Sequence, residues 1–172
     1  MTTRNEAIDI LDAGHARIRQ LIKRTPPHWM ARPGVGDGAW SPKDLLGHLC
    51  FWEEKVLEAL AAWDAGERAP IDRDIYSASI NAINAEGVRL RSRHTLARVQ
   101  RDWDNVHGRL IRTIRAMPDA RWENPATSRG RKSLGHRVGQ LLVGKEPFGH
   151  EDAHVKDLAA FVEAIPGRAE GA

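Results

Sequence analysis

Two histidines four residues apart, His150 and His154, lie in the segment GHEDAHVKDL near the C-terminal end of the sequence. On an α-helix this spacing puts both imidazoles on one face, where both can reach the same ion. The face continues through Leu158 and Phe161, which predicts that the pair points into a helical core. Buried imidazoles need partners, and a metal ion, a carboxylate or a water would each supply one. The pair alone leaves metal binding and a structural role equally open.

The letters HEDAH also match His-Glu-x-x-His, the helix pattern of zinc peptidases, in which the glutamate is the general base. Only residues 155–172 follow the second histidine, and they hold neither the HxxGxxH extension nor a strand pattern. We therefore predict that the protein is not a peptidase. Successive helical side chains differ by about 100° in direction, so Glu151 is expected to support the histidines from behind or to lie on the surface.

A third histidine, His48, offers a further ligand from a distant part of the chain. It shares a helical stripe with Asp44 and Trp52, next to an apolar stripe. Facing helices of a bundle commonly build metal sites from inward-pointing side chains. Three neutral imidazoles suit Zn, Ni, Fe or Cu better than Mg or Ca. The residues therefore predict a divalent transition metal at these histidines and leave these four ions open.

Other side chains near these histidines have two interpretations each. Trp40 and Trp52 could form the apolar walls of a pocket or anchor the helix in the core. Asp44, one turn before His48, could accept a hydrogen bond from that ligand or serve only the helix N-terminus. His107 borders another apolar stripe, and we interpret it as a histidine at the edge of the core.

Helical periodicity runs along almost the whole chain, and no segment alternates as a strand would. The first expected helix ends near Thr25, and the second is capped by Ser41. A short connecting piece over 77–90 leads to a third helix, whose apolar stripe runs from Leu96 to Met117. The last helical region runs from Ser133 to about Ala164, and Pro147 kinks or divides it. The sequence therefore predicts an all-α four-helix bundle, with a short connecting helix between helices two and three, formed by residues 1–172 as a single domain.

The composition limits the class of protein. Hydrophobic residues make up 41% of the chain and charged residues 28%, which indicates a globular protein rather than a disordered one. No apolar run approaches the roughly 18 residues of a membrane span, and the N-terminus lacks a hydrophobic signal core. The single cysteine, Cys50, excludes an internal disulfide. We therefore expect a cytoplasmic protein without a membrane partner.

The net charge is only +3, but basic residues concentrate in two segments, 89–101 and 128–132. No recognition helix or aromatic stacking motif accompanies them. Arginines interleaved with apolar residues at helical spacing are more often a solvated helix face. We therefore expect no nucleic-acid partner, and DNA binding that weakens steeply with salt would contradict this expectation.

Residues 40–60, WSPKDLLGHLCFWEEKVLEAL, resemble the W-S-x-x-D-x-x-x-H-L-x-x-W-E signature of the DinB/YfiT-like four-helix proteins. NAINAEG at 81–87 and the GHEDAHVKDL helix fit the ClbS/DfsB branch, whose last helix typically carries E-H-x-x-x-H. The resemblance covers nearly the whole chain in order. It implies a four-helix bundle with a metal held by His48, His150 and His154, and we expect this metal to be Zn or Ni. The sequence departs from the family at Phe148-Gly149, where Glu or Tyr-Glu is common.

Relatives in this superfamily include S-transferases and isomerases that use low-molecular-weight thiols, and a resistance protein that hydrolyses a genotoxic cyclopropane. The resemblance implies a metal-dependent hydrolase or transferase that detoxifies an electrophilic small molecule, with a low-molecular-weight thiol as a cosubstrate of the transferase. The alternative is a stress-response protein that sequesters such a molecule without catalysis, so enzyme activity is left open. Many members are dimers, which implies a homodimer here.

Overall fold

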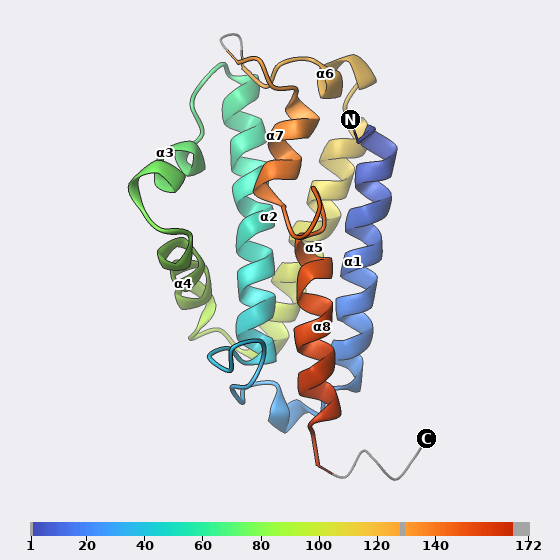
Figure 1. Cartoon of the computed structure of the whole chain (residues 1–172), viewed down its shortest axis with the longest axis vertical. Coiled ribbons are helices and arrows are strands. Elements are labelled where there is room, and N and C mark those ends of the chain that lie inside the picture. The colour runs from blue at the N-terminus through green and yellow to red at the C-terminus, as the bar shows by residue number, and fades with distance from the viewer. Residues whose placement is uncertain (1, 128–129, 167–172) are drawn as a thin grey trace.

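The structure is a computed structural model that describes residues 2–127 and 130–166, and these residues form helices and no β-strand. Four columns of helix lie side by side along the long axis of the molecule (Figure 1). They are α1 (Arg4–Arg24), α2 (Pro42–Asp64), α5 (Leu96–Ala116) and a fourth column in which α7 (Leu134–Leu141) lies above α8 (His150–Glu163). The predicted all-α four-helix bundle is confirmed.

Capping residues determine where the first two helices begin. Thr3 and Glu6 form a capping box at the start of α1, in which each side chain accepts from the other residue's backbone N–H. Ser41 and Asp44 form the same arrangement at the start of α2, with Pro42 at the first helical position. The cap at Ser41 agrees with the sequence-based prediction.

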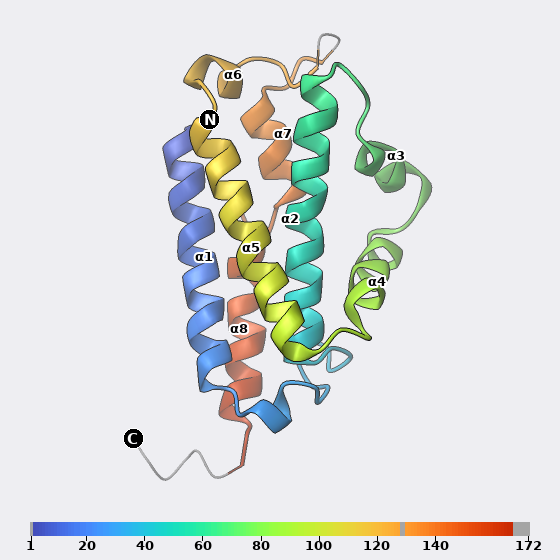
Figure 2. The ribbon, with the colours of Figure 1, turned by 180° about the vertical axis from the view of Figure 1, so that it is seen from behind.

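The connection between α2 and α5 contains two helices rather than the one short piece expected, α3 (Pro70–Ser77) and α4 (Ile80–Arg91). Ser79 caps α4 and so separates the two. Both lie outside the bundle on the α2 side (Figure 2). A Cβ at Gly87 would lie 2.8 Å from Cγ of Phe51, so α4 approaches α2 as closely as a residue without a side chain allows. Two further short helices, η1 (Pro27–Trp29) and α6 (Asp119–Glu123), lie in the loops.

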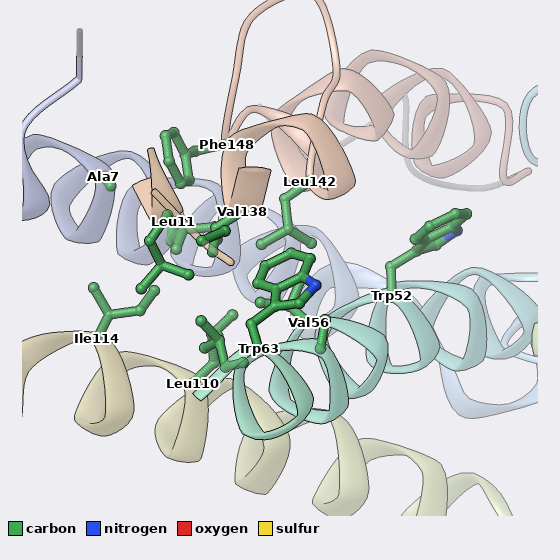
Figure 3. Close-up of a cluster of buried hydrophobic side chains, with 14 of the residues drawn as sticks. Ala7, Leu11, Trp52, Val56, Trp63, Leu110, Ile114, Val138, Leu142 and Phe148 are labelled. Atoms are coloured by element: carbon green, nitrogen blue, oxygen red, sulfur yellow. The ribbon is translucent and has the colours of Figure 1, made fainter. Parts of the chain in front are cut away.

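The bundle interior contains two apolar clusters. One is formed mainly by α1, α2, α5 and α7, and includes Leu11, Val56, Leu110, Val138 and Phe148 (Figure 3). The other lies nearer the opposite end of α2 and includes Ile18, Leu49, Trp103, Val106 and Leu158. On α1 and α5, a buried histidine stands between the last member of one cluster and the first of the other: His15 and His107. On α2, the buried Glu53 comes directly after Phe51 and Trp52, the first members of the first cluster on this helix.

The fourth column is interrupted between α7 and α8, as Pro147 predicted. Phe148 has a φ of 66°, a left-handed conformation that costs energy for a side chain with a Cβ. Its ring is buried and stacks on Trp122 at 5.8 Å between centroids, and this packing holds the strained backbone in place. α8 begins two residues later, at His150. Across the described part of the chain, no helix combines the length and hydropathy needed to cross a membrane.

Candidate metal centre

The three histidines that the sequence singled out come together between α2 and the first two turns of α8. Ligand nitrogens of His48, His150 and His154 all lie within 4.8 Å of one another. The Nε2 atoms of His48 and His150 are 3.0 Å apart. The backbone N–H of His150 donates to the carbonyl of Leu142, which ties the start of α8 to the end of α7. We call this group the three-histidine cluster.

Electrostatics keep these imidazoles neutral. Burial, reinforced by repulsion from its two neighbours, lowers the pKa of His48 to about 2. Burial and then His154 lower the pKa of His150 to about 3, and burial lowers the pKa of His154 as well. Each neutral imidazole carries one N–H and one nitrogen lone pair, so the three rings offer up to three lone pairs to an ion. This donor set fits a divalent transition metal.

Both predicted tryptophans contact the three-histidine cluster. The Trp40 ring is 4.7 Å from the His48 ring and 6.4 Å from the His154 ring between centroids. The Trp52 ring is 6.2 Å from that of His150, and its indole N–H donates to Asn84 Oδ1 at 2.9 Å. Trp52 is buried and Trp40 is half-buried. Trp52 therefore both lines the cluster and anchors α2, whereas Trp40 forms a wall that solvent reaches.

Asp44 serves the helix N-terminus. Its Oδ2 accepts from both the backbone N–H and the hydroxyl of Ser41, at 3.1 and 2.7 Å. The Nδ1 atom of His48 is buried and finds no partner among the residues that the structure describes. The structure therefore shows the second of the two interpretations of Asp44, the one in which it does not orient His48.

Glu151 points away from its neighbour His150 and into the middle of the bundle. Its Oε1 accepts from the indole N–H of Trp103 at 2.8 Å and lies 3.2 Å from Nδ1 of His15. Only 4% of the residue is exposed, so the surface position considered for it is wrong. Ligand atoms of Glu151, His15 and His107 lie within 4.8 Å of one another, which makes a second group of possible metal ligands.

His107 is buried inside this second group rather than at the edge of the core. Its Nδ1 lies 2.8 Å from Glu53 Oε1 and its Nε2 lies 3.0 Å from Asp12 Oδ1. The sequence-based interpretation missed His15 and Glu53. A signal existed: His15 follows Leu11 by four residues and precedes Ile18 by three, so it stands on the apolar stripe of α1.

Ionisation in the second group differs from that in the first. Burial raises the pKa of Glu151 to about 7 and also raises that of Glu53. Burial and then the neighbouring His107 lower the pKa of His15 to about 4. Burial would lower the pKa of His107 too, but the hydrogen bond and charge of Glu53 outweigh it and raise this pKa to about 9. The second group therefore holds charge that the three-histidine cluster does not.

The sequence matches the family model of the DinB superfamily over residues 10–144, which is more than half of the chain. The protein therefore belongs to the DinB superfamily, as its helix-two signature indicated. The matched region contains His48 and ends before His150. No curated protein matches the sequence.

Two solved structures share the fold over nearly their full length. One is the colibactin self-resistance protein ClbS in complex with double-stranded DNA, with a TM-score of 0.77 and 10% sequence identity over 96% of this chain and 98% of that one. The other is an uncharacterised protein from Escherichia coli UTI89, with a TM-score of 0.75 and 12% identity over 95% of this chain and 94% of that one. At these identities the likeness shows a common fold.

The ClbS complex corrects one sequence-based expectation. The absence of a recognition helix led us to expect no nucleic-acid partner, yet a protein of this fold is crystallised with double-stranded DNA. The inference was wrong because it required a dedicated recognition element, whereas contacts to phosphates need only basic side chains on a surface. Part of the second basic segment, Ser128 and Arg129, lies outside the residues that the structure describes.

Proposed function

We propose that this protein is a metal-dependent enzyme of the DinB superfamily that acts on an electrophilic small molecule, by thiol transfer or by hydrolysis. The observation that carries the proposal is the convergence of three neutral imidazoles, from α2 and α8, within 4.8 Å. A set of three protein ligands is typical of catalytic rather than structural zinc sites, because it leaves one position for water or substrate.

The surroundings of the cluster support this chemistry. A zinc or nickel ion held there would lower the pKa of a bound water or thiol and so provide a nucleophile near neutral pH. Trp40 and Trp52 lie against the imidazoles and would exclude water from one side of the reacting molecule. Trp40 is the more exposed of the two, so we place the entrance for the small molecule on its side.

Elemental analysis of untagged protein tests the metal centre. We expect about one zinc or nickel ion per chain, with loss of the ion in His150→Ala and in His154→Ala. His136→Ala is the matched control, because His136 is an exposed histidine on α7 and should leave the metal content unchanged. The proposal fails if the wild-type protein carries no metal and takes up neither zinc nor nickel.

Turnover separates catalysis from sequestration. Metal-loaded protein would be mixed with a panel of electrophiles, each with low-molecular-weight bacterial thiols and with water alone. Thiol-dependent consumption indicates a transferase, and thiol-independent consumption indicates a hydrolase. Saturable binding without turnover across the panel would instead favour the sequestering alternative. Sedimentation of the same sample tests the expected homodimer.

A second candidate function, binding of double-stranded DNA, is favoured by the ClbS complex together with one surface of this protein. Arg101, Arg109 and Arg112 are exposed along α5. Binding of a fluorescent duplex over a range of salt concentrations would test it, since the slope of log K against log salt counts the phosphates contacted. Replacing the three arginines by alanine should flatten the slope, whereas Lys156→Ala on α8 should not.

A further inference from the structure

A layer of ionisable side chains crosses the bundle between its two apolar clusters. Each long helix contributes one member: His15 from α1, Glu53 from α2, His107 from α5 and Glu151 from α8. We call these four residues the buried polar layer. Each is at most 6% exposed. Burying ionisable groups is costly unless every donor and acceptor finds a partner. Each polar atom of the layer is therefore expected to have one.

Each imidazole of the buried polar layer has a carboxylate oxygen at both of its nitrogens. The four contacts are His15 Nδ1 to Glu151 (3.2 Å), His15 Nε2 to Asp104 (3.2 Å), His107 Nδ1 to Glu53 (2.8 Å) and His107 Nε2 to Asp12 (3.0 Å). His107, with its raised pKa, donates an N–H to both of its carboxylates. His15, with its lowered pKa, is neutral and carries one N–H, and its Nε2 also lies 3.0 Å from Nη2 of Arg19.

Only one of the two imidazoles can carry a proton on both nitrogens without a large cost. The His15 and His107 rings stack face to face, 3.8 Å apart between centroids and within 6° of parallel. Two imidazolium ions at that separation repel each other strongly in a buried site. The layer therefore holds one imidazolium, His107, against two buried glutamates.

The glutamates show the same deficit. Oε2 of Glu53 and Oε2 of Glu151 are both buried and have no hydrogen-bond partner within residues 2–127 and 130–166. A buried carboxylate oxygen without a donor costs the full desolvation of that atom. Both oxygens therefore need a positively charged or hydrogen-bonding partner that the described side chains do not supply.

We propose that the buried polar layer is a second metal site, in which His15, His107 and Glu151, assisted by Glu53, bind a divalent first-row transition metal. A mixed set of imidazole and carboxylate donors suits Zn²⁺, Fe²⁺ or Mn²⁺. A cation at the Nδ1 side replaces the Nδ1 proton of His107 and supplies the carboxylate oxygens with a partner. His107 then donates its Nε2–H to Asp12, the arrangement usual for metal-bound histidine.

This site is independent of the proposed function, since it shares no ligand with the three-histidine cluster. Bundles commonly place such sites where glutamates and histidines from several helices project inward. Asp12 and Asp104 are half-exposed at the outer edge of the rings, so the layer reaches solvent on the α1 and α5 side. A cation would enter past these two carboxylates.

The test first removes metal binding at the three-histidine cluster and then measures metal binding at the buried polar layer. A His150→Ala/His154→Ala variant would be dialysed against Zn²⁺ and its metal content determined, with far-UV circular dichroism as the check of folding. We expect about one zinc ion per chain to remain. Adding Glu53→Gln and Glu151→Gln, which keep side-chain size and the acceptor for Trp103, should remove this ion.

The matched control adds His28→Ala and His136→Ala instead, because both histidines are exposed, and it should keep the ion. A folded His150→Ala/His154→Ala variant that binds no zinc overturns the proposal. Zinc that survives the two glutamine substitutions overturns it as well. If the background variant does not fold, Co²⁺ titration decides: the wild-type chain should bind about two Co²⁺ and Glu53→Gln/Glu151→Gln about one. Equal stoichiometry in the two proteins contradicts the second site.

Discussion

The three-histidine cluster and the buried polar layer each include a residue of the first turn of α8, but their side chains differ in kind and in charge. His150 faces α2, where imidazole and indole rings contact it, and Glu151 faces α1 and α5, where carboxylates contact both rings of a histidine stack. In the first cluster the pKa values of His48 and His150 fall to about 2 and 3. In the second, His107 has its pKa raised to about 9.

This difference shows that burial alone does not determine the pKa of a histidine. Burial is the largest cause of the shift in His48 and His150, and it acts in the same direction on His107. The neighbouring carboxylates, Glu53 first and then Glu151 and Asp12, reverse the outcome. A bundle can therefore place neutral ligands and charged groups within a single turn of one helix, provided that they point to different sides.

The largest expected effect comes from separating the two clusters at adjacent positions. His150→Ala should weaken zinc binding at the three-histidine cluster by more than about a hundredfold, above the 10- to 100-fold that loss of a supporting residue usually costs. Glu151→Gln should leave that affinity within about threefold of the wild-type value, because its side chain lies on the other side of α8. Competition with a zinc-sensitive dye measures both. A large loss of affinity in Glu151→Gln would show that the clusters are not separate.

The second largest effect is expected when the stability of chelator-treated protein is measured at different pH values. Because the pKa values of His48 and His150 are lowered from 6.5, the unfolded chain binds protons below pH 6.5 that the folded chain does not. Stability should therefore fall as the pH drops from about 6.5 towards 3, by up to about 1.4 kcal/mol per pH unit for each imidazole. Urea unfolding at several pH values measures this slope.

His48→Gln is the comparison for that experiment, because glutamine does not titrate. The stability of this variant should change less steeply with pH, by the contribution of one imidazole. His107 works in the opposite direction: its raised pKa contributes stability below pH 6.5 that is lost as the pH rises through about 9. An identical slope in wild-type protein and His48→Gln would contradict the neutral state assigned to the cluster.

A smaller effect is expected when an indole is replaced in each cluster. Trp103→Phe removes the N–H that donates to buried Glu151 and should cost about 1–3 kcal/mol of unfolding free energy. Trp40→Phe retains an aromatic wall at a half-buried position and should cost less than about 1 kcal/mol. Denaturant midpoints of the two variants test the ranking, and a larger loss for Trp40→Phe would reverse it.

The smallest effect is expected at the residue after Glu151. Asp152 pairs with Arg17 at 2.8 Å, but both side chains are about half exposed. Exposed ion pairs contribute little, so Asp152→Asn should change stability by less than about 1 kcal/mol. The same change of acid to amide at Glu151 acts on a buried group and should have a clearly different effect. Equal midpoints for the two variants would remove the distinction between the two sides of α8.

The sequence determined the bundle and one of its two clusters for identifiable reasons. Thr3, Ser41 and Pro147 act on their own neighbours, so the starts of the first two helices and the break before α8 follow from local chemistry. His150 and His154 are brought together by one helix, and the spacing of His48 on α2 pointed to the same interior. These residues could be predicted without knowing how the helices pack.

The buried polar layer could not be predicted in the same way. Its four members come from four helices, and His15 and Glu151 are separated by 136 positions along the chain. Each is one polar residue on an apolar stripe, and Glu53 follows Leu49 by four residues and precedes Val56 by three. That pattern shows that a residue is buried, but not what it contacts. The contacts depend on the rotation and height of each helix in the bundle, which only the assembled structure supplies.

The interruption before α8 also has a mechanical consequence. The strained backbone at Phe148, held by the stack on Trp122, fixes the angle at which the helix starts. Since each residue advances a helix by about 100°, a shift of α8 by one residue in the position where it packs would turn each of its side chains by more than a quarter turn. His150 and His154 would then point away from α2, and Glu151 would point away from His15. The loop before α8 therefore determines the alignment of both clusters.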